Sequence, residues 1–220
     1  MENWTRVVQR IRARAREILQ QTAPAIRYPG IPFPGLRAFE PEEAPVFFGR
    51  EDEKRELARR LDRERRFLVV FGDSGSGKSS LVKAGLVPVW KARRPEGQGH
   101  LLLTTPNSFP DHNPFTALVA GLPRLPAGAP RPGELVQSLV ARPRDIGHWI
   151  DLALKPCPKG AEALVIIDQF EELFAPAEPN SDPALPERFI DLIEALAGHP
   201  RARVSMMVVT ARRVPFRSGG

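Results

Sequence analysis

Residues 67–82 read FLVVFGDSGSGKSSLV, and this stretch carries the strongest indication of the fold class. Its first part, Phe67–Phe71, is continuously apolar, which is typical of a short buried strand. Gly72–Ser79 then matches the spacing G-x-x-x-x-G-K-[ST] of a Walker A phosphate loop, and a helical pattern follows it. A strand before the loop and a helix after it suit phosphate binding, because loop N–H groups and the helix N-terminus then face one anion.

The residue types in the loop predict their roles. Glycines let the backbone wrap closely around a phosphate, Lys78 can reach the β and γ phosphates, and the Ser79 hydroxyl can ligate Mg²⁺. A plain strand–turn–helix corner would need one glycine, so we predict nucleotide binding. The candidate binding residues of the loop are Gly72, Asp73, Ser74, Gly75, Ser76, Gly77, Lys78, Ser79 and Ser80.

A second apolar run, ALVIID at 163–168, ends in a carboxylate. We expect Asp168 to emerge at the carboxyl edge of the sheet, where ligands of open α/β sheets bind, and to hold Mg²⁺ through a water as the Walker B acid. Glu171 and Glu172 follow within one turn, and either could orient and deprotonate the attacking water. Glu172 is slightly favoured, but the sequence does not separate the pair. The alternative is a charged helix start, where acidic residues are favourable.

A third site element is expected after the last apolar run, 203–210, which leads into VVTARRVPF. In P-loop proteins whose catalytic strand is not next to the loop strand, the strand between them ends in a polar sensor near the γ-phosphate. Thr210 or Arg212 could fill that position, and a surface turn is the alternative.

The wider pattern predicts an α/β fold with a mainly parallel sheet covered on both faces, a three-layer P-loop NTPase sandwich. Apolar strands are expected at 66–71, 100–105, 163–168 and 203–210. The expected helices between them are Glu51–Arg66, Lys78–Trp90 ending near Pro88, Asn113–Leu122, Gly133–Ala141, Asp145–Leu154 and Leu185–Ala197.

The N-terminal residues differ from the rest in charge. The chain of 220 residues has a net charge of +6, and about four of these charges lie in Met1–Tyr28. Asn3–Gln21 has the spacing of an amphipathic basic helix, which Pro24 ends. We therefore predict a helix and linker over 1–28 and a P-loop core over 29–220. The helix could pack on the core or on its own copy, dock a partner protein, or contact a membrane surface or nucleic acid.

The remaining composition restricts the cofactors and the compartment. Cys157 is the only cysteine, which favours a reducing cytoplasm. We expect neither a membrane span nor a signal peptide, because no apolar run is long enough. The four histidines show no ligand spacing, so we expect no metal beyond nucleotide-bound magnesium.

Three stretches together resemble the bacterial novel STAND NTPases, signal-transduction ATPases with numerous domains that are related to AAA+ and NACHT proteins. They are PGLRAFEPEEAPVFFGRE at 34–51, GDSGSGKSSLVKAGLVP at 72–88 and VIIDQFEELF at 165–174, and the resemblance runs from Pro29 to Phe216. It implies an ATP- or GTP-driven switch with an ASCE-type core, whose base contacts would be Phe48, Gly49 and Arg50. Family members usually continue into a winged-helix region and sensing repeats, so protein partners or self-association are expected.

The sequence departs from the family in ways that favour a second interpretation. Asp73 places an acid in the phosphate loop, and TARRVPF at 210–216 alters the sensor region. The related folds order their strands 5-1-4-3-2, and no fifth strand is seen before Gly220. We therefore expect an incomplete core with a bare edge beside the loop strand. The alternative function is a nucleotide-binding interaction module without useful turnover. A small-molecule kinase is disfavoured, because no lid with clustered arginines is found.

Overall fold

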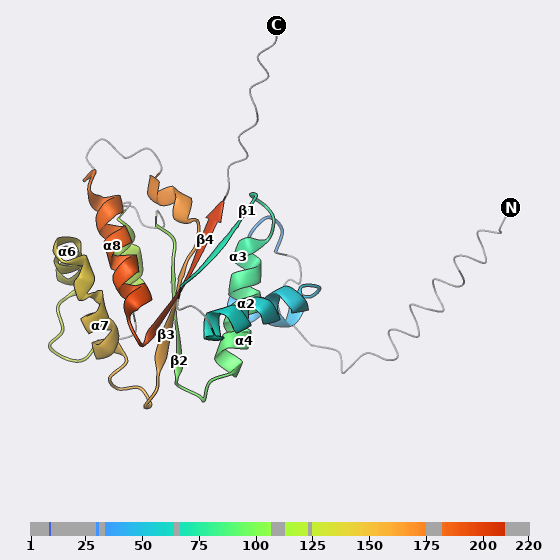
Figure 1. Ribbon diagram of the computed structural model, residues 1–220, viewed down its shortest axis with the longest axis horizontal. Helices are drawn as coiled ribbons and strands as arrows, with labels where there is room; N and C mark the ends of the chain where they lie inside the picture. Colours follow the sequence, from blue (N-terminus) through green and yellow to red (C-terminus); the bar gives the residue numbers. More distant parts are fainter. Residues whose placement is uncertain are drawn as a thin grey trace, which may run out of the picture. The chain divides into compact units, whose positions relative to one another are not determined.

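The computed structural model in Figure 1 describes Gln9, Gly30 and residues 34–63, 67–106, 113–122, 125–174 and 182–209. The chain divides into two compact units, Met1–Phe33 and Pro34–Gly220, and every element below belongs to the second. The predicted helix Asn3–Gln21 and the predicted sensor residues Thr210 and Arg212 lie outside the described residues.

Four parallel strands form one sheet in the order β1-β4-β3-β2 (Figure 1). Their register places Val165 of β3 opposite Leu102 of β2 and Val204 of β4. The α/β fold and its parallel sheet are confirmed. The strands are β1 (Phe67–Gly72), β2 (Gly99–Thr104), β3 (Glu162–Ile167) and β4 (Ala202–Val209).

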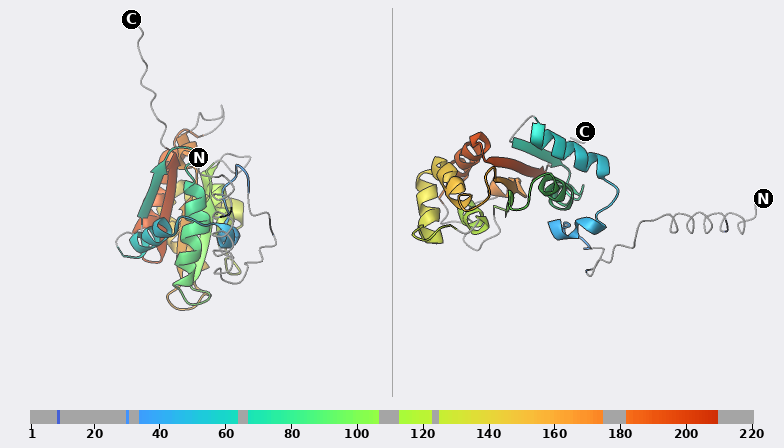
Figure 2. Two further views of the ribbon diagram at one scale, coloured as in Figure 1. Left: turned by 90° about the vertical axis from the view of Figure 1, so that its right-hand side faces the viewer. Right: turned by 90° about the horizontal axis from the view of Figure 1, so that it is seen from below.

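Helices cover the sheet on both faces, so the fold has three layers (Figure 2). One face carries α2 (Glu51–Arg63), α3 (Lys78–Ser80), the π-helix η2 (Leu81–Leu86) and α4 (Val87–Ala92). The other face carries α5 (Pro114–Gly121), α6 (Pro132–Ala141), α7 (Ile146–Ala153) and α8 (Leu185–Gly198). Short 3-10 helices are η1 (Pro41–Val46), η3 (Pro143–Asp145) and η4 (Phe170–Phe174). No helix within the described ranges is long and apolar enough to cross a membrane.

The central strand β3 explains why both faces are covered. Alternate strand residues point to opposite faces, so Val165 and Ile167 join the core under α5–α8, while Leu164 and Ile166 join the core under α2 and α4. All four side chains are fully buried. The buried β3 therefore fixes where its carboxyl end, and the following Asp168, can lie.

The helix predicted over Lys78–Trp90 is present, but it does not end near Pro88, because the helical path continues to Ala92. The N–H of Val87 donates to the carbonyl of Val82, five residues back, so the chain makes a π-turn before the proline. Pro88 then occupies one of the first two positions of α4, where a missing N–H costs little. A wide turn thus accommodates a residue that would end a regular helix.

The loop strand β1 is less buried than predicted. Val69 is 37% exposed and Phe71 is 72% exposed, whereas Leu68 is buried. β1 pairs only with β4 among the described strands, so it forms an edge of the sheet. An apolar sequence predicts burial on both faces, but an edge strand is covered only where a helix reaches it.

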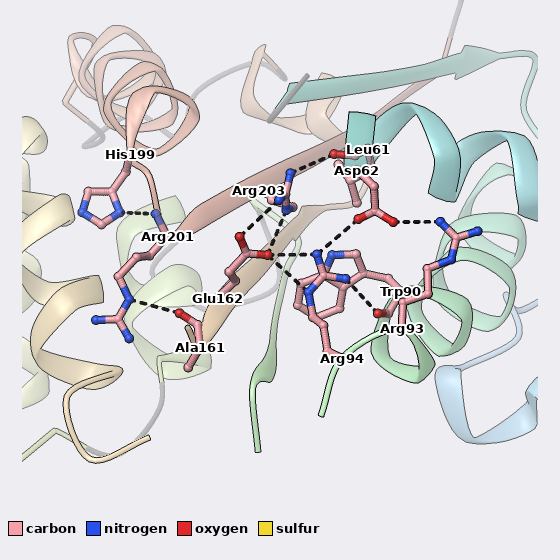
Figure 3. Close-up of polar contacts among 10 residues, drawn as sticks. All are labelled: Leu61, Asp62, Trp90, Arg93, Arg94, Ala161, Glu162, His199, Arg201 and Arg203. Atoms are coloured by element: carbon pink, nitrogen blue, oxygen red, sulfur yellow. Dashed lines mark hydrogen bonds and ion pairs between the residues drawn. The ribbon is translucent and has the colours of Figure 1, made fainter. Parts of the chain in front are cut away.

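A network of ion pairs joins the layers at the amino-terminal edge of the sheet (Figure 3). The Glu162 carboxylate at the start of β3 accepts hydrogen bonds from Arg94 at 2.9 Å and from Arg203 at 3.0 Å. Arg94 also donates to Asp62 at 3.2 Å, and its guanidinium lies 4.0 Å from the Trp90 ring centroid. The network therefore ties the ends of α2 and α4 to β3 and β4.

The charge state of Glu162 links this network to pH. Burial by itself raises the pKa of Glu162, but the hydrogen bonds and positive charges of Arg203 and Arg94 outweigh it, so the pKa lies below its ordinary value of 4.5. Since the folded pKa is depressed, the ionised carboxylate contributes fully to stability above that value. This contribution is lost as the pH falls through 4.5 and below it.

We expect Glu162→Gln to lower the free energy of unfolding at neutral pH by about 1–2 kcal/mol, because two arginines lose a charged acceptor. Thermal unfolding measured from pH 7 down to pH 3 should show the difference from the natural chain shrinking below about pH 4.5. Glu194→Gln, on the exposed side of α8, is the matched control and should change little. Equal stability of the Glu162 variant and the control at pH 7 would contradict a stabilising network.

Candidate functional site

The loop between β1 and α3 has the backbone of a phosphate cradle. Gly75 and Gly77 have φ angles of +74° and +80°, a region that residues with side chains rarely adopt. A Cβ added to Gly77 would also lie 3.2 Å from Nη1 of Arg50. Glycine at 77 therefore permits both the left-handed turn and the close approach of Arg50 from the start of α2.

The side chain of Lys78 is held inside this loop. The residue is only 9% exposed, and its ammonium donates to the carbonyls of Gly72 at 2.8 Å and Asp73 at 2.7 Å. These contacts keep a positive charge at the loop, where it can meet a phosphate. The Asp73 residue itself is exposed, so solvent screens the acid that the sequence placed in the loop.

Ser79 and Asp168 meet although 89 residues separate them in sequence. The Ser79 hydroxyl donates to Oδ1 of Asp168 at 2.7 Å, and Asp168 is only 4% exposed. The N–H of Asp168 donates to the carbonyl of Thr104 at 2.8 Å, which fixes the chain just beyond β3 against β2. A hydroxyl and a carboxylate are hard oxygen donors of the kind that Mg²⁺ prefers, so this pair fits a nucleotide-bound magnesium ion.

Lys83 adds a contact that the sequence did not predict. Its ammonium lies 3.1 Å from Oδ2 of Asp168 and 3.3 Å from Oε1 of Glu40, and the side chain is only 11% exposed. Lys83 follows Ser79 by four residues, which is one helical turn, so both side chains lie on one helix face. That spacing was the available signal, whereas nothing in the sequence indicated where Glu40 would lie.

A pocket of about 680 Å³ opens over the loop, within the range of about 300–1,000 Å³ typical of small-molecule sites. Loop residues, Lys83 and Asp168 line one part of it, and residues 35–40 line another. The N–H of Phe39 donates to the Ser80 hydroxyl at 3.1 Å, which holds this lead-in segment against the helix that follows the loop. The lead-in segment therefore forms part of the pocket wall.

The predicted base-binding residues lie beside the loop but do not line this pocket. Arg50 donates to the carbonyl of Ser76 at 3.1 Å, and the N–H of Gly49 donates to the Glu51 carboxylate at 3.1 Å. Phe48 is 67% exposed. The apolar side chains that line the pocket are instead Leu36, Ala38 and Phe39.

The candidate general bases lie on η4, directly after Asp168. Gln169 has a φ of +51°, and its side-chain amide donates to Oε1 of Glu172 at 2.6 Å. Glu171 and Glu172 are both half-buried. The structure thus brings Lys78, Ser79 and Asp168 together with the acidic turn close by.

No curated protein matches the chain. The solved structures that resemble it include the ORC2 protein of Aeropyrum pernix, in ADPNP and ADP complexes, with a TM-score of 0.46 and 19% identity. That likeness covers 75% of this chain and 42% of the other, so the chain spans less than half of that protein's length. The family model described as novel STAND NTPase 1 matches residues 32–218, and the chain therefore belongs to the novel STAND NTPase 1 family.

Proposed function

We propose that this nucleotide-binding P-loop NTPase is the core of a signalling switch that binds ATP or GTP with Mg²⁺ and hydrolyses it slowly. The observation that carries the proposal is the 2.7 Å contact between Ser79 and Asp168 beside the loop that holds Lys78. In this scheme residues 1–28 are an arm for a protein partner or a second copy, which sedimentation of the chain with and without the arm would test. The single cysteine, Cys157, favours work in the cytoplasm.

Each residue of the site has a role in the proposed reaction. Lys78 and the loop N–H groups bind the β and γ phosphates, and Ser79 and Asp168 hold Mg²⁺, which supplies charge neutralisation at the phosphates. Glu172 or Glu171 orients the attacking water. Thr210 or Arg212 senses the γ-phosphate. Phe48, Gly49 and Arg50 would contact the base from beside the pocket, because they do not line the part of it that lies over the loop.

The contact between Gln169 and Glu172 supports slow turnover. The Gln169 amide donates to Oε1 of Glu172 at 2.6 Å, which restrains the carboxylate and leaves it fewer lone pairs to accept from a water. The same contact favours the second candidate, an interaction module that binds nucleotide without useful turnover, if Gln169 holds the carboxylate away from the attacking water. Phosphate release by the purified chain separates the two candidates.

We expect Glu172→Gln to reduce phosphate release at least about 100-fold while nucleotide affinity stays unchanged, because general-base removal affects only the chemical step. Glu171→Gln tests the other candidate base on the same turn, and we expect it to reduce the rate only a few-fold because Glu172 is the favoured base. A large loss in Glu171→Gln alone would assign the base to Glu171, and Glu194→Gln on the exposed side of α8 is the control. The measurement is single-turnover phosphate release with excess protein. Equal rates in both variants and the natural chain would contradict a carboxylate base on η4. If the natural chain releases phosphate no faster than the Lys78→Ala variant, the second candidate is favoured.

A further inference from the structure

We infer that Lys83 acts as a resident cation for Asp168 and thereby sets how strongly nucleotide binding depends on Mg²⁺. The inference rests on the proposed function, since it concerns the same site.

Protein groups contact both oxygens of the Asp168 carboxylate. Oδ1 accepts from the Ser79 hydroxyl at 2.7 Å and from the N–H of Gln169 at 3.0 Å. Oδ2 lies 3.1 Å from the Lys83 ammonium. Both oxygens are therefore satisfied by groups of the protein, and the negative charge is balanced by a positive charge on the same helix face as Ser79.

The side chains of Lys83 and Asp168 are both largely buried. They are only 11% and 6% exposed, so little water screens their charges. Charges in such surroundings act on their neighbours more strongly than charges on the surface. The Lys83 charge is thus felt by any ion that approaches Asp168, and Lys83 lines the pocket over the phosphate loop.

The Lys83 charge has opposite effects on the binding of Mg²⁺ and on the binding of the nucleotide. A divalent cation beside Asp168 is attracted by the carboxylate but repelled by Lys83, so Lys83 weakens the contribution of Mg²⁺. The polyphosphate of a nucleotide is attracted by Lys83, so Lys83 strengthens binding without metal. Removing the Lys83 charge therefore shifts metal-free and magnesium-dependent binding in opposite directions, which loss of packing alone would not do.

Glu40 allows an independent test of how the Lys83 charge affects magnesium-dependent binding. Its carboxylate lies 3.3 Å from the Lys83 ammonium and draws this charge toward the lead-in segment. Without the Glu40 charge, Asp168 is the remaining acidic contact of Lys83 among the described residues. Neutralising Glu40 is therefore expected to have the opposite effect to neutralising Lys83, and a smaller one because Glu40 is 42% exposed.

The experiment compares ATP binding by the full chain in excess Mg²⁺ and in EDTA, using isothermal titration calorimetry. The readout is the ratio of the Kd in EDTA to the Kd in Mg²⁺, called the magnesium enhancement. We expect Lys83→Met to raise this enhancement about tenfold, from interaction of a unit charge at this depth. Lys83→Arg should keep it, Glu40→Gln should lower it about two- to threefold, and Lys91→Met on the exposed part of α4 should not change it.

If the magnesium enhancement of Lys83→Met stays within twofold of that of the natural chain, this inference is overturned and the proposed function is not. If the natural chain binds neither ATP nor GTP in either condition, the proposed function fails and this inference fails with it. Thermal unfolding of each variant shows whether it is folded. If Lys83→Met does not fold, the Glu40→Gln variant tests the inference instead. An unchanged or raised magnesium enhancement in Glu40→Gln overturns it.

Discussion

Replacing Lys78 by alanine is expected to lower the affinity for Mg-ATP roughly 100-fold, the equivalent of about 2.7 kcal/mol. The Lys78 ammonium is buried against the carbonyls of Gly72 and Asp73. Without it, these carbonyl oxygens would face the phosphate anions with no positive charge between them. Fluorescence anisotropy of a labelled ATP analogue, competed with unlabelled Mg-ATP, measures the change.

Lys91→Ala is the matched control for this prediction. Lys91 lies on α4, which continues the helical path that begins at Lys78, and it is exposed. Both variants remove one lysine charge, so a general effect of net charge would appear in both. Equal affinities of the Lys78 variant and the natural chain would show that the nucleotide does not bind at this loop.

Asp168→Asn is expected to remove most of the magnesium enhancement and to reduce phosphate release more than about 100-fold. The amide keeps the size of the side chain and can still accept from Ser79, but it has no charge for a metal ion. ATP affinity in EDTA is expected to rise, because Lys83 then has no buried carboxylate to balance it. Calorimetry with and without Mg²⁺, together with phosphate release, gives the three quantities.

Asp52→Asn controls for loss of a carboxylate elsewhere. The Asp52 side chain on α2 is 95% exposed and should leave all three quantities unchanged. Thermal unfolding of both variants separates a site effect from loss of the fold. A normal magnesium enhancement in a folded Asp168→Asn variant would remove Asp168 from the metal site.

The sequence predicts the layered sheet well because each strand carries its own local signal. The run ALVII at 163–167 is continuously apolar, and in the structure all five of these residues are buried in β3. The glycine spacing of the loop is equally local, since Gly75 and Gly77 are needed for their own φ angles. Ser79 follows β1 and Asp168 follows β3, so placing these two strands in one parallel sheet predicts that the two residues meet.

Other features depend on contacts that no local pattern contains. The helical path past Pro88 depends on a π-turn that shifts the hydrogen bonds before the proline. The exposure of Phe71 depends on whether a helix reaches that part of the edge strand β1. The position of Glu40 near Lys83 depends on how an irregular lead-in folds over the loop helix, and neither hydrophobic periodicity nor a motif encodes that path.

The loop at Gly72–Ser79 is proposed to bind a nucleoside triphosphate. Isothermal titration calorimetry of the intact chain with ATP in excess Mg²⁺ measures this binding. We expect saturable binding at one site with a Kd in the micromolar range. Absence of saturable binding for both ATP and GTP, with a chain that unfolds cooperatively on heating, would contradict it.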